Sequence, residues 1–429
     1  MSREELQRLW NEALQSPAPD EAQFERVAQT VVEIYDSDDT QFRLHIKNRL
    51  GRVTESTGQS FDAENFDFAM AQAFVADEVG FTSWGGLVNA IQNPSDLRYS
   101  ILFQYAIAAL WRGDFTSLEN TTGGPTAFDE HIRTWYEAGY FADEPETFAE
   151  CFAAACWLGH EKTVEYLLDN GVDPYAGMRT GLAGFHWAAS SGRLNVIKFL
   201  TKRKLPMEVE NMYGGTVLGQ ALWSAINEQT PDHAEIIEVL IEGGAHIWPN
   251  TLEWWQEQPV PSQETKEQVV NALHRHELLL EAARLRETGD DYKLGKKLRE
   301  LGEFERRMPG KRVDVINHYI ESVDLLRRCD DKRKLAHTVR HLGNIYHENG
   351  DFDAAEPLLV EAIQIYRDDG DRKSLDYANA LRSLAVFYKD KGDVLHSAPL
   401  FREANELYKA YRIKEGIEET EAPRKTKDE

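Results

Sequence analysis

Apolar positions along this chain follow a helical spacing, and their pattern recurs with two different periods. In the middle of the chain, alanine recurs every 33 residues, at Ala155, Ala188 and Ala221. Near the C-terminus, the tyrosine at position 346 recurs 42 residues later as Tyr388. A repeat of this length is one pair of helices that cannot bury its apolar face alone, so neighbouring pairs must stack. The pattern predicts an all-α protein with two α-solenoid repeat arrays, preceded by a small helical N-terminal region.

The 33-residue period marks the two helices of each unit. Gly159 aligns with Gly192, and each is expected to end a first helix in a tight turn that a Cβ atom would hinder. Val164 aligns with Ile197 in the pattern of a buried stripe on the second helix. A third copy fits residues 233–247 after a short insertion.

The 42-residue period is carried by residues 341–366 and 383–408. Gly350 and Pro357 both recur in the second copy. The proline is expected near the first turn of a second helix, where its missing N–H costs least. A less regular copy precedes these two, over about 294–329.

The first hundred residues are helical in pattern but not repetitive. One helix is predicted to stop at Gly80, and a short helix is predicted to begin at Thr82 or Ser83. Phe81 and Trp84 are expected to seal this end of the repeat array.

Prolines and shifts in composition divide the chain into five parts. Pro259 and Pro261 interrupt the helical pattern, and the last dozen residues are rich in charge and poor in apolar side chains. The predicted division is an N-terminal helical region (1–98), a first repeat array (99–250, with clear repeats over about 145–250), a linker and cap (251–270), a second repeat array (271–416) and a disordered charged tail (417–429).

The middle array resembles the ankyrin repeat. Residues 183–189, AGFHWAA, stand where that family carries Thr-Pro-Leu-His-x-Ala. Phe185 and His186 match its Leu and His, whereas Ala183 and Gly184 depart from its Thr and Pro. The resemblance implies that His186 hydrogen-bonds to backbone and orders a turn, rather than serving as a ligand or a catalyst.

The C-terminal array resembles the tetratricopeptide repeat over residues 335–412. Its period is longer than the family's usual 34 residues and is similar to that of kinesin light chains and many bacterial proteins. Val339 and Leu381 replace the signature Trp. Together with the Gly-Phe-Thr-Ser-Trp segment at 80–84, the two arrays make the chain resemble bacterial proteins that combine ankyrin and tetratricopeptide repeats.

Charge is distributed unevenly along the chain. Residues 1–270 hold 18 Lys and Arg against 41 Asp and Glu, whereas residues 271–429 hold 30 against 32. Residues 284–340 are locally positive, with 16 basic and 11 acidic side chains. An acidic N-terminal half repels phosphate, so nucleic acid is not an expected partner. The positive span is a candidate to contact the acidic half of the same chain, a second copy, or an acidic partner.

Cysteine usage and hydropathy point to a cytoplasmic protein. Cys151, Cys156 and Cys329 form no CxxC pair and no even framework, so reduced thiols are expected. No stretch approaches the roughly 18 apolar residues of a membrane span, and the chain starts without the pattern of a secretory signal. We therefore expect no membrane partner.

The sequence holds no motif for catalysis or cofactor binding. A phosphate loop, a GxSxG elbow and zinc-type Cys/His spacings are all missing. His337 and His341 are four residues apart, but they have no obvious third ligand on that face. His274 and His276 do not share a helix face. We predict no catalytic residue, no cofactor and no metal site.

The tetratricopeptide resemblance implies a peptide-binding face on the first helix of each pair. Placing Gly343 at the family's small eighth position puts two sets of side chains there: His337, Arg340, Asn344, His347 and Glu348 in one repeat, and Asn379, Arg382, Val386, Lys389 and Asp390 in the next.

Arg340, Asn344 and Arg382 could hold a peptide carboxylate through charge-assisted hydrogen bonds. They resemble the family's carboxylate clamp only in part, because Ser383 and Asn379 stand where the clamp has its second Asn and its next Lys. A solvated polar helix face is the alternative.

The ankyrin resemblance implies a second surface at the turn tips. Its candidate residues are Tyr175, Met178, Arg179, Met212 and Tyr213. Two repeat arrays in one chain favour a non-enzymatic cytoplasmic adaptor or scaffold that binds a protein or peptide partner. The alternatives are a self-associating structural or regulatory protein, motivated by the charge asymmetry, and an enzyme with a site near residues 80–84.

Overall fold

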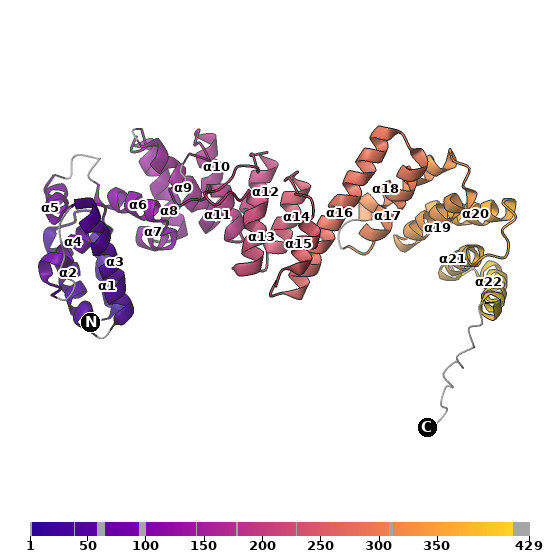
Figure 1. Cartoon of the computed structure of the whole chain (residues 1–429), viewed down its shortest axis with the longest axis horizontal. Coiled ribbons are helices and arrows are strands. Elements are labelled where there is room, and N and C mark those ends of the chain that lie inside the picture. The colour runs from indigo at the N-terminus through magenta and orange to yellow at the C-terminus, as the bar shows by residue number, and fades with distance from the viewer. Residues whose placement is uncertain are drawn as a thin grey trace, which may run out of the picture. The chain divides into compact units, whose positions relative to one another are not determined.

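The computed structural model describes residues 2–37, 39–57, 65–93, 100–142, 144–176, 179–228, 230–308 and 312–414. These residues form 22 helices and no β-strand (Figure 1), so the all-α prediction is confirmed. The chain divides into two compact units, residues 1–272 and 273–429. The predicted disordered tail and the candidate Met178 lie outside the described residues.

Unit 1 opens with five helices around an apolar core that includes Phe24 and Phe74. Gly80 follows the end of α4 with a φ of 90°. Ser83 then caps α5, because its hydroxyl accepts a hydrogen bond from the Gly86 N–H at 3.2 Å. The predicted stop and restart are confirmed. The five helices are α1 (Arg3–Leu14), α2 (Glu21–Asp36), α3 (Thr40–Thr57), α4 (Phe68–Glu78) and α5 (Trp84–Gln92).

The rest of unit 1 is a series of short helices whose spacing follows the 33-residue period. Ala155 and Ala188 are fully buried on first helices, and Ile197 is buried on a second helix, as predicted. Gly192 has a φ of 72°, and a Cβ atom there would lie 2.2 Å from the Thr230 hydroxyl. The helices are α6 (Ile101–Arg112), α7 (Phe115–Thr122), α8 (Pro125–Glu137), α9 (Pro145–Leu158), α10 (Glu161–Asp169), α11 (Gly184–Ser190), α12 (Leu194–Lys202), α13 (Val217–Asn227) and α14 (His233–Glu242).

A short helix, α15 (Thr251–Glu257), follows the last repeat of unit 1, and the predicted break comes after it. Trp255 is fully buried and its indole N–H donates to the Lys266 carbonyl at 3.2 Å, whereas Trp254 is exposed. Only one of the two tryptophans therefore covers the core. The chain becomes helical again in α16 (Gln263–Thr288), and the boundary between the two units falls inside this helix.

Unit 2 consists of helix pairs with the 42-residue period. Gly343 is tightly packed, because a Cβ atom there would lie 2.9 Å from the Leu359 side chain. Pro357 is the sixth residue of α20, which places it in the second turn, just after the first turn near which it is predicted. The helices after α16 are α17 (Asp291–Glu305), α18 (Arg312–Arg327), α19 (Lys332–Glu348), α20 (Phe352–Asp368), α21 (Leu375–Asp390) and α22 (Val394–Lys414).

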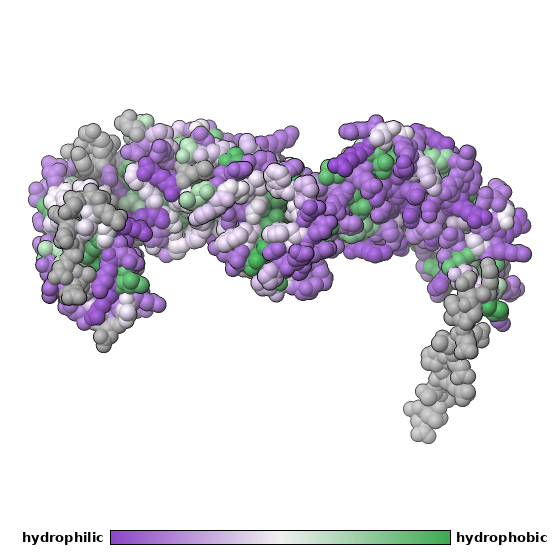
Figure 2. All heavy atoms as spheres, in the orientation of Figure 1, coloured by the Kyte–Doolittle hydropathy of each residue, from purple (hydrophilic) through white to green (hydrophobic). Residues whose placement is uncertain are grey.

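The surfaces of the two units differ in hydropathy. Figure 2 shows hydrophilic residues over most of the drawn face of α16–α20, whereas paler residues gather over α10–α14. On the face drawn, the surface of α16–α20 is therefore more polar than that of α10–α14.

Candidate functional site

One region of unit 2 buries polar atoms that have no hydrogen-bond partner among the described residues. Arg340 is only 9% exposed and donates from Nη2 to His341 Nε2 at 2.9 Å. Its Nε has no partner. The same is true of Arg299 Nε, His337 Nδ1, His341 Nδ1 and Tyr366 OH. We call these five residues, which come from α17, α19 and α20, the α19 polar cluster.

The cluster presents donors and few acceptors. A guanidinium can only donate, so His341 Nε2 must accept and its Nδ1 must carry the proton. That Nδ1 lies 3.8 Å from Glu303 Oε2, which is beyond a hydrogen bond. A buried donor without an acceptor costs about 1–3 kcal/mol. A carboxylate, which only accepts when ionised, is the chemical complement of such a set.

Positive charge dominates the cluster. Burial, together with the charge of Arg340, lowers the pKa of His337 to about 4 and that of His341 to about 2. Both rings are therefore neutral at neutral pH, while the guanidinium groups of Arg299 and Arg340 stay charged. Burial also lowers the pKa of Arg340. Electrostatic interactions with Tyr366 and Asp376 raise that pKa again, but only in part. An anion bound here would stabilise the charged guanidinium.

The predicted peptide-binding set is only partly gathered at this place. His337 and Arg340 belong to the cluster, but three other predicted residues have partners of their own. Glu348 pairs with Arg306, His347 Nε2 lies 3.3 Å from an Asp390 oxygen, and Asn379 accepts from the Tyr408 hydroxyl at 2.6 Å.

The remaining predicted residues differ mainly in exposure. Arg382 and Lys389 are exposed on α21, whereas Asn344 on α19 and Val386 on α21 are half-buried. None of the four has an ion pair or a side-chain hydrogen bond in the part of the chain that the structure describes. Arg382 is thus exposed to a ligand and Asn344 partly so, whereas a ligand could reach Arg340 only through the small part of its side chain that is exposed.

Sequence reasoning missed Arg299 and Tyr366 as members of the cluster. Arg299 precedes His341 by one period of 42 residues, so it occupies the equivalent position of the previous repeat. That spacing could have identified it. Tyr366 is fully buried, and its aromatic ring follows the pattern of the core. No sequence signal marks its hydroxyl as unpartnered.

Metal binding by His337 and His341 finds no support in the geometry. Their ring centroids lie 4.6 Å apart, but Nε2 of His341 is already occupied by Arg340. Among the described residues, no group of three or more His, Cys, Asp or Glu side chains is placed to hold a metal ion.

Unit 1 carries a groove of about 570 Å³ beside α11 and α13. Its apolar wall includes Tyr213 and Trp223, which are 78% and 50% exposed. We call this feature the ankyrin groove, and its lining residues used below are Leu182, Trp187, Ser190, Asn211, Tyr213, Gln220, Trp223 and Glu228.

A chain of hydrogen bonds forms the polar side of the ankyrin groove and ends on a carboxylate. The Asn211 amide donates to Gln220 Oε1 at 3.1 Å, and the Gln220 amide donates to Ser190 Oγ at 3.3 Å. Ser190 Oγ in turn donates to Glu228 Oε2 at 3.1 Å. Ser224 joins the chain by donating to Ser190 at 3.1 Å. Because the donors all run toward Glu228, they hold its carboxylate in place.

His186 fixes the loop that carries Tyr213. Its Nε2 lies 2.9 Å from the Val209 carbonyl and 3.1 Å from the Gly215 carbonyl, so that nitrogen carries the proton. Burial lowers the pKa of His186, which keeps the ring neutral. The predicted structural role of His186 is confirmed. Asn211 adds to the same loop by accepting from the backbone N–H of Tyr213 at 2.9 Å.

The predicted turn-tip residues fall into two groups. Tyr175 donates to the Pro206 carbonyl at 2.7 Å, and Arg179 lies 3.9 Å over the Trp111 ring and 2.9 Å from Glu146. These two side chains brace neighbouring turns. Met212 and Tyr213, by contrast, are exposed beside the ankyrin groove.

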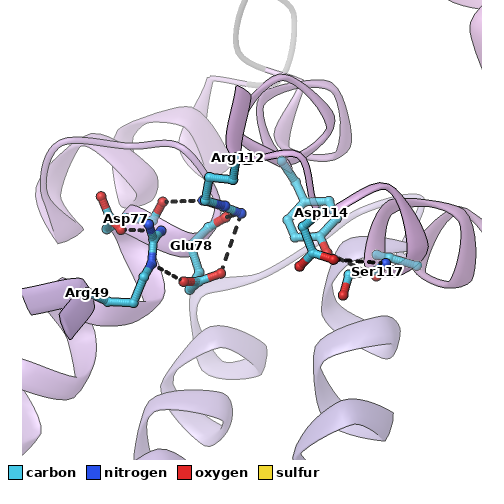
Figure 3. Close-up of polar contacts among 8 residues, drawn as sticks. Arg49, Asp77, Glu78, Arg112, Asp114 and Ser117 are labelled. Atoms are coloured by element: carbon cyan, nitrogen blue, oxygen red, sulfur yellow. Dashed lines mark hydrogen bonds and ion pairs between the residues drawn. The ribbon is translucent and has the colours of Figure 1, made fainter. Parts of the chain in front are cut away.

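Near residues 80–84, where an enzyme site is an alternative, the structure has a network of paired charges. Arg49 from α3 lies 2.5 Å from both Asp77 and Glu78 at the end of α4. Arg112 from α6 lies 3.4 Å from Glu78, which sits between the two arginines in Figure 3. Burial raises the pKa of Asp77. Each carboxylate here has a guanidinium partner, which is the arrangement of a structural ion-pair network that ties together three helices.

Comparison with known proteins identifies the two repeat types. Residues 151–251 match the ankyrin repeats (3 copies), and residues 333–410 match the tetratricopeptide repeat. No curated protein matches the chain. Among solved structures, the chain is similar to BtubC (BKLC) from P. vanneervenii, at 15% identity and a TM-score of 0.30, with 66% of this chain and 97% of that chain covered. The chain therefore combines ankyrin repeats with C-terminal tetratricopeptide repeats, which are modules of protein–protein interaction.

Proposed function

We propose that this chain, which joins an ankyrin array to a tetratricopeptide array, is a non-enzymatic cytoplasmic adaptor with a separate binding surface in each unit. The α19 polar cluster carries the proposal. It combines a buried guanidinium with several unpartnered donors, on the first helix of a repeat that elsewhere serves peptide binding. An acidic side chain or a terminal carboxylate of a partner peptide would satisfy those donors.

Two further observations support the proposal. Arg382 and Asn344 have no partner among the described residues, so they can extend the contact with a peptide. None of the described helices is long and apolar enough to cross a membrane, and Cys151, Cys156 and Cys329 are all free thiols.

The test is capture of partners from a lysate of the producing cells with the full chain as bait. We expect Arg340→Glu combined with Arg382→Glu to abolish retention of at least one partner, because the change reverses two charges at the ligand. Arg340→Met is a gentler variant that removes the charge and keeps most of the volume. Arg402→Glu on α22 is the matched control, since Arg402 is exposed and lies on the second helix of its pair.

Circular dichroism would confirm that each variant still folds. Partners that remain bound to the folded Arg340→Met and double charge-reversal chains would refute the assignment of the α19 polar cluster. A partner lost equally on Arg402→Glu would show only a dependence on overall charge.

The second candidate function is self-association, and the uneven charge favours it. Residues 284–340 are net positive, while residues 1–270 are strongly acidic. If the opposite charges of two chains attract, light scattering should report an oligomer at low salt that dissociates as salt screens the attraction. A monomer at every salt concentration would count against this alternative.

A further inference from the structure

Seven of the ten residues that line the ankyrin groove come from an acidic stretch of the chain. Residues 205–265 hold ten Asp and Glu and no Lys or Arg. The residues of the groove from Asn211 to Glu228 all fall in this span. A stretch of 61 consecutive residues with ten carboxylates and no Lys or Arg favours basic partners over acidic ones.

The groove also offers the surface that a cation prefers. Trp223 and Tyr213 are largely exposed, and Trp187 adds a third ring to the lining. The face of such a ring attracts an ammonium or guanidinium group, and tryptophan attracts it most strongly. Exposed aromatic rings of this size are otherwise unfavourable on a surface, so their gathering at one groove marks a place where something binds.

Glu228 supplies the counter-charge. Its Oε2 accepts from Ser190, and the preceding hydrogen bonds from Gln220 and Ser224 lead to the same serine. In the described part of the chain Glu228 has no cationic partner. A carboxylate that is held in place but left without a cation is ready to receive one at little cost in side-chain entropy.

We propose that the ankyrin groove binds a lysine or arginine side chain from a basic segment of a partner protein. The aliphatic stem of that side chain packs against Leu182 and the rings of Trp187 and Trp223. Its charged head reaches Glu228, and Tyr213 covers the bound segment from the loop that His186 and Asn211 fix. This proposal rests on the adaptor function proposed above, and it assigns the chemical class of the partner for unit 1.

The test uses a defined probe and the full chain. The probe is a fluorescein-labelled peptide of nine residues in which lysine and glycine alternate, and binding is followed by fluorescence anisotropy at 50 mM and 150 mM NaCl. The matched peptide carries acetyl-lysine at every lysine, which removes the charge and keeps the stem. We expect binding of the lysine peptide only.

Variants separate the groove from the acidic surface around it. Trp223→Ala is expected to weaken binding of the lysine peptide at least tenfold, and Glu228→Gln at least fivefold, because the amide keeps the contact to Ser190 but has no charge. Trp248→Ala is the matched control, since Trp248 is 66% exposed on the same acidic span and does not line the groove. It should leave binding unchanged, and thermal melts would confirm that all three variants fold.

Three results would overturn the proposal. One is equal affinity for the acetylated and unmodified peptides. Another is equal weakening by Trp223→Ala and Trp248→Ala, which would mean that the acidic surface attracts the peptide without using the groove. The third is failure of the wild-type chain to bind the lysine peptide at 50 mM NaCl. That result would overturn the proposal even if the basic residues 284–340 of the same or a second chain filled the groove. If lysate capture recovers no partner but the lysine peptide still binds at the groove, the adaptor function is refuted and the proposal for the groove is retained.

Discussion

The ankyrin groove and the α19 polar cluster differ in what they do with their hydrogen bonds. In the groove, the side chains of Asn211, Gln220 and Ser190 donate one to the next, and the last bond ends on the carboxylate of Glu228. In the cluster, Arg340 and its neighbours keep donors for which the described residues supply no acceptor. The first arrangement holds a negative charge in place, and the second holds positive charge that lacks an acceptor.

This contrast suggests a rule for where specificity is encoded in a repeat protein. Both sites stand on stacked helix pairs, and the repeat itself fixes only the packing of Ala, Gly and Leu positions. A few polar side chains on the first helices decide the sign of the charge that is presented. We therefore expect function to follow from the local chemistry of each array rather than from its fold.

The largest expected effect comes from separating the stability of the two units. All ten tryptophans lie in residues 1–272, so indole fluorescence reports unit 1 alone, while circular dichroism reports both units. Gly343→Leu forces atoms into the space of Leu359 and is expected to destabilise unit 2 by about 3 kcal/mol. In a urea titration of this variant, part of the circular dichroism signal should be lost at a lower urea concentration than in the wild type, as unit 2 unfolds. The midpoint of the fluorescence transition, which reports unit 1, should not change.

Gly192→Ala is the matched change in unit 1, since its Cβ atom would meet Thr230 at a positive φ. It should lower the fluorescence midpoint. A common shift of both signals by either variant would mean that the two units unfold together.

A smaller effect is expected from pH. The folded-state pKa values of His337 and His341 lie below the unfolded value, so the unfolded chain binds more protons as the pH falls. The stability that the two neutral rings contribute is then fully present above about pH 6.5, and it is lost progressively as the pH falls below that value. Allowing for solvent screening, the loss is on the order of 1–2 kcal/mol by pH 4.5.

The double variant His337→Gln/His341→Gln should remove that part of the slope, measured as the urea midpoint of the dichroism at pH 7 and pH 4.5. The exposed His396→Gln is the control. An unchanged slope in the double variant would show that the two rings do not control the acid sensitivity.

The smallest effect concerns Arg382, the exposed arginine that we expect to contact the same ligand as Arg340. Arg382→Ala alone is expected to weaken binding of a glutamate–glycine peptide only two- to threefold, because an exposed charge pair contributes less than about 1 kcal/mol. Arg340→Met should weaken the same peptide at least tenfold. Anisotropy titrations would measure both, and a larger loss with Arg382→Ala would place the ligand on the outer face of α21 instead of at the cluster.

Repeat periods were sufficient to predict the architecture, because packing positions recur at fixed spacing. Ala155, Ala188 and Gly343 fell where their periods place them, and His186 took the role that the ankyrin pattern assigns to it. Pro357 lies slightly deeper in α20 than predicted, since periodicity defines a helix pair better than it defines the first residue of each helix.

The binding sites were less accessible to sequence reasoning. Arg340 lies on a first helix, as the repeat register predicts, but its burial depends on how α17, α19 and α20 pack, which no local pattern encodes. Glu348 and His347 were selected by the same helical spacing, yet Arg306 and Asp390 occupy them. Glu228 lies in a span where acidic residues are frequent, so only its hydrogen-bonded neighbours distinguish it.

A crossed titration tests the central claim, that the two units bind opposite charges at separate sites. The full chain and its Trp223→Ala and Arg340→Met variants would each be titrated against the lysine–glycine and the glutamate–glycine peptide. The account predicts that Trp223→Ala weakens only the lysine peptide and Arg340→Met only the glutamate peptide, each at least tenfold. Equal weakening of both peptides by either variant, or competition between the two peptides for the wild-type chain, would contradict it.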